Sequence, residues 1–94
     1  MTISKQLMYW FIVSSKGGIN RAKIIQSLKE KPMNIHQLSE KMGMHYTTIQ
    51  HHIMLLVKHG FLVGTGDEYG KAYFLSQDLE DVYHEFKKIT GQKE

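Results

Sequence analysis

The sequence predicts a mainly α-helical domain with one small β-hairpin. Three observations support this fold class. Three short segments with helical apolar periodicity lie between Gly17 and Gly60, and each opens with a capping pattern. Two β-rich segments follow Gly60, and apolar side chains recur at helical spacing near both ends of the chain. The 94 residues, 41% of them hydrophobic, suffice for one modest core, so a single domain over residues 1–94 is expected.

The capping pattern consists of an apolar residue, a potential N-cap, and a second apolar residue five positions after the first. It occurs at Ile19-Asn20 with Ile24, at Met33-Asn34 with Leu38, and at Met44-His45 with Ile49. It predicts helices over about 21–31, 35–42 and 46–59, which end before Pro32, Gly43 and Gly60. Gln37 occupies the capping-box position of the second helix, whereas His45 is a poor N-cap for the third.

The segments on either side of these three predicted helices also have recognisable patterns. Residues 61–63 and 72–75 are rich in β-forming side chains and flank a glycine-containing loop, which predicts a hairpin over 61–75. A last helix begins after Ser76 and aligns one apolar stripe, namely Leu79, Val82, Tyr83, Phe86 and Ile89. Residues 1–15 are predicted to form a helix, with a strand through Met8 to Val13 as the alternative.

Two short helices joined through Gly43 and followed by a hairpin have the packing pattern of a helix-turn-helix with a wing. The predicted fold is therefore a winged helix-turn-helix with extra N- and C-terminal helices. Residues 1–15 form the N-terminal helix, 20–60 the three-helix core, 61–75 the wing, and 76–90 a C-terminal dimerisation helix. An ordinary helical hairpin is the alternative for residues 35–61.

Several segments resemble ArsR-like winged-helix regulators, especially small archaeal members. They are Asn34 to Gly43, Thr47 to Ile53, Gly60-Phe61-Leu62, Tyr69-Gly70 and Tyr73 to Ser76, and the resemblance covers about residues 19–90. It implies a dimer that inserts the second helix of the motif into the major groove and pairs through its terminal helices. His52 matches a histidine common in that family and is interpreted as a half-buried packing residue.

The outward face of the third helix supplies the candidate contacts with bases. With Ile49, Ile53 and Leu56 buried, the side chains near the amino end turn outward, and these are Tyr46, Thr47, Gln50 and His51. Gln50 is the first choice for direct readout, because a glutamine amide pairs in bidentate fashion with adenine N6 and N7. A solvated helix surface is the alternative for each single residue.

Basic side chains supply the candidate phosphate contacts. Residues 1–60 carry eight Lys/Arg against two Asp/Glu, while residues 61–94 carry four against seven, within a net charge of +3. Lys23, Lys41 and Lys58 are predicted to meet phosphates, and Tyr69 and Lys71 of the wing to reach the neighbouring minor groove or backbone. Asp67 and Glu68 at the wing tip repel phosphates, so the wing is expected to contribute little affinity.

The expected partners are double-stranded DNA and a second copy of the chain. The candidate dimer interface consists of Leu7, Trp10, Phe11, Leu79, Val82, Tyr83 and Phe86, with burial in one subunit's own core as the alternative. A winged helix that binds another protein instead of DNA is the alternative function.

Other function classes are not predicted. The sequence has no cysteine and no glycine-rich phosphate loop, so neither an enzyme nor a cofactor or small-molecule substrate is expected. No metal site is expected; Asp81 and His84 forming half of an intersubunit site is the alternative. The seven-residue apolar run from Leu7 to Val13 falls short of the about 20 residues that span a membrane, and no cleavage site follows it. A cytoplasmic protein is therefore expected.

Overall fold

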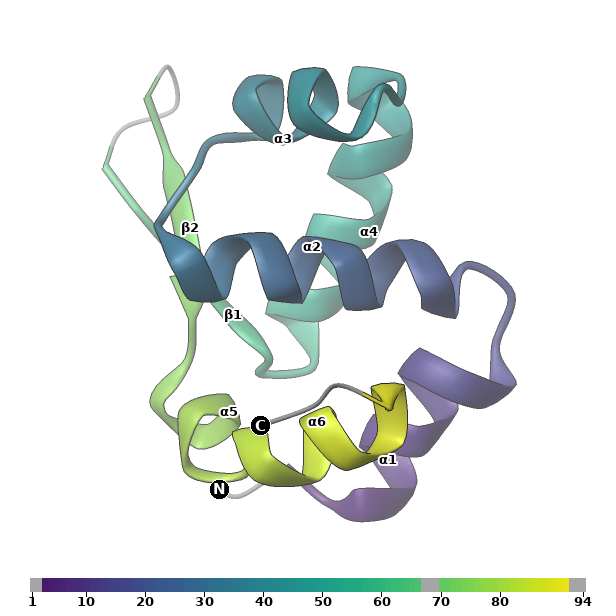
Figure 1. Cartoon of the computed structure of the whole chain (residues 1–94). Helices are drawn as coiled ribbons and strands as arrows, with labels where there is room; N and C mark the ends of the chain where they lie inside the picture. The colour runs from purple at the N-terminus through teal and green to yellow at the C-terminus, as the bar shows by residue number, and fades with distance from the viewer. Residues whose placement is uncertain (1–2, 67–69, 92–94) are drawn as a thin grey trace.

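A computed structural model describes residues 3–66 and 70–91 of the chain. In chain order the elements are α1 (Lys5–Tyr9), the π-helix η1 (Trp10–Ser14), α2 (Gly18–Glu30), α3 (Ile35–Met42), α4 (Tyr46–Lys58), β1 (Leu62–Thr65), β2 (Ala72–Leu75), α5 (Gln77–Asp81) and α6 (Tyr83–Thr90) (Figure 1). The predicted fold, a mainly helical winged helix-turn-helix with extra terminal helices, is confirmed.

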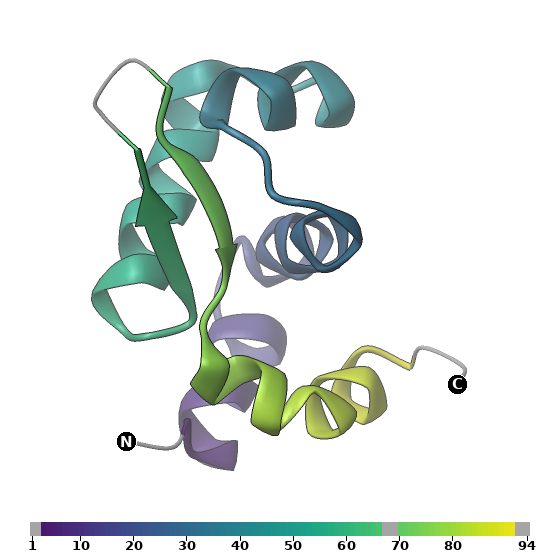
Figure 2. The same ribbon diagram turned by 90° about the vertical axis from the view of Figure 1, so that its left-hand side faces the viewer.

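Helix α2 separates two layers of the molecule. On one side of it lie α3 and the amino end of α4, and on the other lie α1, η1, α5 and α6 (Figures 1 and 2). The β1–β2 hairpin runs along one flank beside α4 and α2, and the chain continues from β2 into α5 (Figures 1 and 2). A single core joins the layers, because fully buried side chains come from every level: Met8, Phe11, Ile24, Ile25, Leu38, Ile49, Ile53, Leu56, Phe61, Leu79 and Phe86.

The helix-turn-helix forms as its local sequence predicts. The Asn34 side chain accepts from the Gln37 amide at 2.7 Å, and the Gln37 side chain accepts from the Asn34 amide at 2.8 Å. This reciprocal capping box satisfies two amides at the start of α3. Gly43 follows the helix with φ 64°, a left-handed conformation that glycine adopts without steric cost.

The wing is a two-stranded antiparallel hairpin. Leu62 pairs with Leu75 and Thr65 with Ala72, and Tyr73 also exchanges backbone hydrogen bonds with Met33 at 2.8 and 3.3 Å. This bridge ties the segment before α3 to the wing and fixes the two relative to each other. The predicted wing-tip residues Asp67, Glu68 and Tyr69 lie outside the described residues.

The N-terminal segment is helical, as predicted, and its π-turn places it against the start of α2. The Ser15 amide donates to the Trp10 carbonyl at 2.9 Å, which closes the wider turn of η1. A Cβ on Gly18 would lie 2.2 Å from the Ile12 carbonyl oxygen, so only glycine permits this approach. Helix α2 begins at Gly18, after Gly17 in a left-handed conformation. The predicted start near residue 21, with Asn20 as cap, is wrong; Ile19 is 74% exposed and forms no hydrophobic staple.

The C-terminal helix is interrupted, contrary to the prediction of one helix. At Val82 the backbone leaves helical geometry, with φ −115° and ψ 19°, and separates α5 from α6. The break turns α6 against α1 and η1 of the same chain. The apolar stripe predicted from Leu79 to Ile89 therefore has the N-terminal segment as its neighbour.

No helix within residues 3–66 and 70–91 combines the length and hydropathy needed to cross a bilayer.

Candidate nucleic-acid interface

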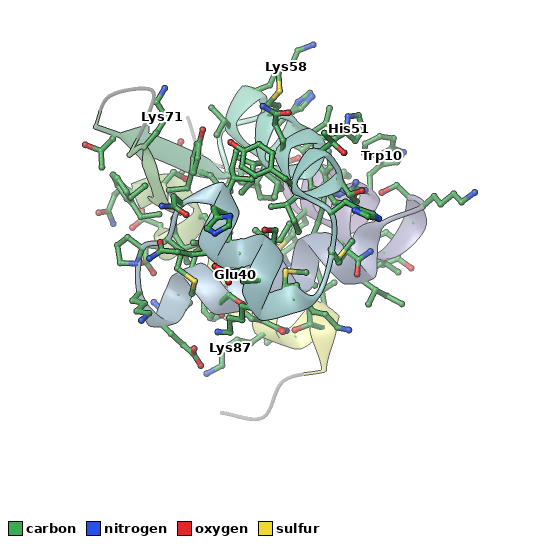
Figure 3. All side chains as sticks on the ribbon, turned by 90° about the horizontal axis from the view of Figure 1, so that it is seen from above. Trp10, Glu40, His51, Lys58, Lys71 and Lys87 are labelled. Carbon is green, nitrogen blue, oxygen red and sulfur yellow. The ribbon has the colours of Figure 1, made fainter. Side chains whose placement is uncertain are left out.

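Helix α4 presents an outward-facing stripe of side chains, here called the α4 stripe and formed near its amino end by Tyr46, Thr47, Gln50 and His51. The opposite face of the helix is anchored in the core. Ile49, Ile53 and Leu56 are fully buried behind it. Tyr46, Thr47 and His51 are exposed and Gln50 is partly buried, as expected if they face outward near the amino end. Lys58, Lys71 and His51 lie toward one side of the molecule, with Glu40 and Lys87 toward the other (Figure 3). The stripe and the wing thus share a face.

A hollow of about 320 Å³ lies where the amino ends of α3 and α4 approach the wing. It is lined by Asn34, Ile35, His36, Tyr46, Gln50, Lys71 and Tyr73. The fold thus brings together three of the predicted contact residues: Tyr46 and Gln50 from α4, and Lys71 from the segment before β2. Burial, with a smaller effect of Tyr46, raises the pKa of the Tyr73 phenol above its ordinary value, so this group stays a hydrogen-bond donor at neutral pH.

The amino end of α4 has no side-chain cap. His45 precedes the helix and makes no capping hydrogen bond with its side chain, as its poor N-cap character predicts. Backbone amides at an uncapped helix start carry partial positive charge and suit an anionic oxygen. This end of α4 carries Tyr46 and Thr47, so charge and side chains are presented together.

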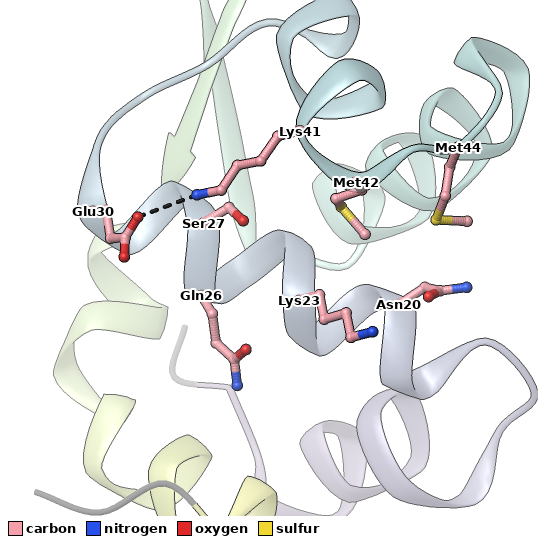
Figure 4. Close-up of a pocket in the computed structure, with 8 residues that line it drawn as sticks. All are labelled: Asn20, Lys23, Gln26, Ser27, Glu30, Lys41, Met42 and Met44. Carbon is pink, nitrogen blue, oxygen red and sulfur yellow. Dashed lines mark hydrogen bonds and ion pairs between the residues drawn. The ribbon is translucent and has the colours of Figure 1, made fainter.

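The predicted phosphate-contacting lysines fall into two groups. Lys58 and Lys71 both line a groove between α4 and the wing. Lys23 and Lys41 line a separate hollow of about 410 Å³ between α2 and the α3–α4 turn (Figure 4). There Lys41 pairs with Glu30 at 3.2 Å, which offsets its charge. The structure therefore brings Lys58 and Lys71 to the α4 face and does not bring Lys23 or Lys41 there.

Arg21 is the structural residue that the sequence analysis missed. It is 3% exposed; its Nε donates to the Phe11 carbonyl at 3.0 Å, and its Nη2 donates to Ser15 Oγ and to the Lys16 carbonyl. Its Nη1 donates to His52 Nδ1 at 3.3 Å. Arg21 thus ties η1 and the loop after it to α4. A basic side chain at a buried position of α2 is the signal that would have identified it.

His52 is more buried than its predicted half-buried packing role implies, at 7% exposed. An arginine only donates, so His52 Nδ1 accepts and the ring proton resides on Nε2. Burial, the Arg21 charge and then His51 lower the pKa of the His52 imidazole. The ring is accordingly neutral at physiological pH and fixes the orientation of α4.

The candidate dimer residues divide by burial. Phe11, Leu79 and Phe86 are fully buried in the core of one chain, so their predicted place in an interface is corrected: α6 covers η1, and the stripe is satisfied internally. Trp10 is 55% exposed. The partly buried members are Leu7, Val82 and Tyr83, and the Lys29 ammonium lies 4.7 Å from the centre of the Tyr83 ring.

Among residues 3–66 and 70–91, no group of three or more His, Asp or Glu side chains is arranged to hold a metal ion.

A helix-turn-helix formed by α3 and α4, followed directly by a hairpin wing beside the outward face of α4, defines a winged helix-turn-helix protein. The chain belongs to the family described as the methanogenesis regulatory protein FilR1, N-terminal domain, whose model matches residues 12–72. The predicted relation to winged-helix transcriptional regulators is thereby confirmed. No curated protein matches the sequence significantly.

Several solved structures share the fold, including the following two. One is the solution structure of the homodimeric winged helix-turn-helix DNA-binding domain of Mb0332 from Mycobacterium bovis, a possible ArsR-family transcriptional regulator. It is 16% identical, with a TM-score of 0.70, and the match covers 93% of this chain and 76% of that one. The other is HlyU from Vibrio cholerae, 13% identical, with a TM-score of 0.69 and 94% of each chain covered. At these identities the likeness is one of fold.

Proposed function

We propose that this protein binds double-stranded DNA sequence-specifically as a homodimer and regulates transcription, with α4 as the helix that enters the major groove. The observation that carries the proposal is the α4 stripe. Polar side chains stand at the uncapped end of a helix whose opposite face is anchored by three fully buried residues, Ile49, Ile53 and Leu56. A rigid helix with outward polar side chains at its amino end is the geometry of a recognition helix.

In this function Gln50 reads a base, and Tyr46, Thr47 and His51 contact neighbouring bases or phosphates. The Gln50 amide suits adenine N6 and N7, and such a bidentate contact discriminates against other bases by about 1–3 kcal/mol. Lys58 and Lys71 contact phosphates on either side. Each phosphate contact contributes about −0.9 to the slope of log K against log salt concentration.

The homodimer supplies the second recognition helix. Tyr9, Trp10 and Val13 are exposed on the N-terminal segment, and exposed large hydrophobic side chains of this kind suit a partner. The homodimeric Mb0332 domain, which has the same fold, supports this arrangement. Two copies related by a two-fold axis place their recognition helices about 34–36 Å apart, so the operator is an inverted repeat. This role places the protein in the cytoplasm, where it meets DNA.

Selection from random duplexes tests the function. The purified parent, Gln50→Ala and the control Gln26→Ala, a glutamine on α2, select in parallel at fixed salt. The parent and control are expected to enrich the same inverted repeat, and Gln50→Ala to tolerate any base at one position per half-site. Absence of enrichment would refute DNA binding and favour a protein-binding winged helix; an unchanged preference in Gln50→Ala would refute the assigned readout.

A further inference from the structure

The outward stripe of α4 becomes apolar beyond His51. Met54 is 64% exposed, and Val57 and Val63 are also exposed nearby on α4 and β1. They line a groove of about 600 Å³ between the helix and the wing, together with Ile53, Lys58, Leu62, Gly64, Lys71 and Tyr73. A cluster of exposed apolar side chains indicates a surface that binds an apolar group of a partner.

Two lysines place positive charge on this groove. Lys58 comes from α4 and Lys71 precedes β2, and within the described residues neither forms an ion pair. Lys29 and Lys41, by contrast, are paired with Glu80 and Glu30. A groove lined by apolar side chains and flanked by lysines is complementary to a polyanion that carries apolar groups between its negative charges. The major groove of duplex DNA has this character, because thymine 5-methyl groups lie between two phosphate backbones.

The spacing along α4 brings Met54 to the same bases as Gln50. The two residues are four positions apart and so lie on one face, separated by about 6 Å along the helix axis. This distance corresponds to roughly two base-pair steps of about 3.4 Å. It is also shorter than the major groove's width of about 12 Å. A helix that places Gln50 at a base edge therefore keeps Met54 over the neighbouring pairs.

We propose that Met54 is a specificity-determining residue that contacts the 5-methyl group of a thymine within two base pairs of the base read by Gln50. The inference rests on the proposed function, since it requires α4 in the major groove. The thioether side chain is flexible and apolar, which suits contact with a methyl group that offers no hydrogen bond. Lys58 and Lys71 hold the flanking phosphates while Met54 excludes water from the methyl.

Replacement of thymine by deoxyuridine tests this inference, because it removes the methyl group and leaves base pairing intact. In the duplex enriched by the parent, each thymine is replaced in turn. Kd is then measured at fixed salt for the parent, Met54→Ala and Gln50→Ala. One replacement per half-site, within two base pairs of the Gln50 position, is expected to weaken parent binding about fourfold, as loss of one buried methyl-sized group implies.

The variants distinguish loss of the contact between Met54 and the thymine methyl from a general weakening of DNA binding. Met54→Ala should bind parent and deoxyuridine duplexes equally, whereas Gln50→Ala should bind both more weakly and retain the fourfold difference. Met54→Leu, which keeps an apolar side chain, should retain part of it. Because Met54 is exposed, thermal melting of Met54→Ala should match that of the parent, which confirms that the fold is intact.

Four results overturn the inference while leaving DNA binding in place. The first three are a selected duplex without thymine near the Gln50 position, a parent indifferent to every deoxyuridine, and an undiminished methyl effect in Met54→Ala. If Met54→Ala binds the thymine duplex as tightly as the parent does, the groove serves another partner and the inference is again overturned. Failure of the parent to bind any duplex refutes the proposed function itself.

Discussion

Replacing Arg21 with methionine is expected to lower stability far more than loss of any exposed cation. Arg21 makes two buried hydrogen bonds, to the Phe11 carbonyl and His52 Nδ1, and two further bonds at the edge of the core. Hydrogen bonds from a charged donor are worth about 1.5–3 kcal/mol each, so the two buried bonds together contribute roughly 3–6 kcal/mol.

Two effects reduce this loss. Burial of the guanidinium is itself unfavourable, as the lowered pKa of Arg21 indicates, and a methionine side chain fills part of the vacated space. We therefore expect a net loss of about 2–4 kcal/mol in the free energy of unfolding. In a domain of this size each kcal/mol shifts Tm by about 4–8 °C, so Tm should fall by roughly 8–32 °C.

Thermal and urea unfolding, followed by circular dichroism at pH 7.5, measures the effect. Lys23→Met is the matched control: it removes an exposed cation two residues away on the same helix, and should remain within about 0.5 kcal/mol of the parent. A loss below about 1 kcal/mol for Arg21→Met, or an equal loss in the control, would refute the idea that Arg21 joins the N-terminal segment to α4.

Three further variants test pH dependence, phosphate contact and assembly. Because burial and Arg21 lower the pKa of His52, its contribution is complete above the unfolded value of about 6.5 and is lost as pH falls below it. His52→Asn, which keeps an acceptor, should therefore lose less Tm than the parent between pH 7.5 and 5.5; equal losses in a melting series would contradict this. Lys58→Ala should reduce the salt slope of DNA binding by about 0.9, whereas Lys29→Ala, which removes a paired ammonium, should leave it unchanged. Trp10→Ser should shift sedimentation toward the monomer at micromolar concentration, and an unchanged dimer would exclude Trp10 from the interface.

The sequence was sufficient to predict α3, α4 and the hairpin because the signals that form them are local. The capping box lies within four residues, and the stop at Gly43 depends on one backbone conformation. Both are visible in the order of side chains alone. The outward position of Tyr46 and His51 follows from the same periodicity once Ile49 is assigned to the core.

Elements shaped by contacts between distant segments were predicted less well. The early start of α2 accompanies the approach of Gly18 to the Ile12 carbonyl, and the break at Val82 accompanies the packing of α6 against η1. The apolar stripe through Leu79 and Phe86 indicates that one face of the C-terminal helical segment must be buried. It does not indicate whether the same chain or a second chain covers that face. For this reason residues expected between two chains occupy the core of one chain.

The distribution of charge also depends on contacts between distant segments. Residues 1–60 carry a formal charge of +6, from eight basic against two acidic side chains, yet part of this charge is compensated in the fold. Lys29 is paired with Glu80 from the acidic C-terminal third, and Lys41 with Glu30, which this balance already counts. Arg21 is buried and faces backbone carbonyls. Affinity for a phosphate backbone therefore depends on the charge that one face leaves unpaired. Among residues 3–66 and 70–91, that charge at the groove beside α4 is carried by Lys58 and by Lys71, and Lys71 lies outside the basic half of the sequence.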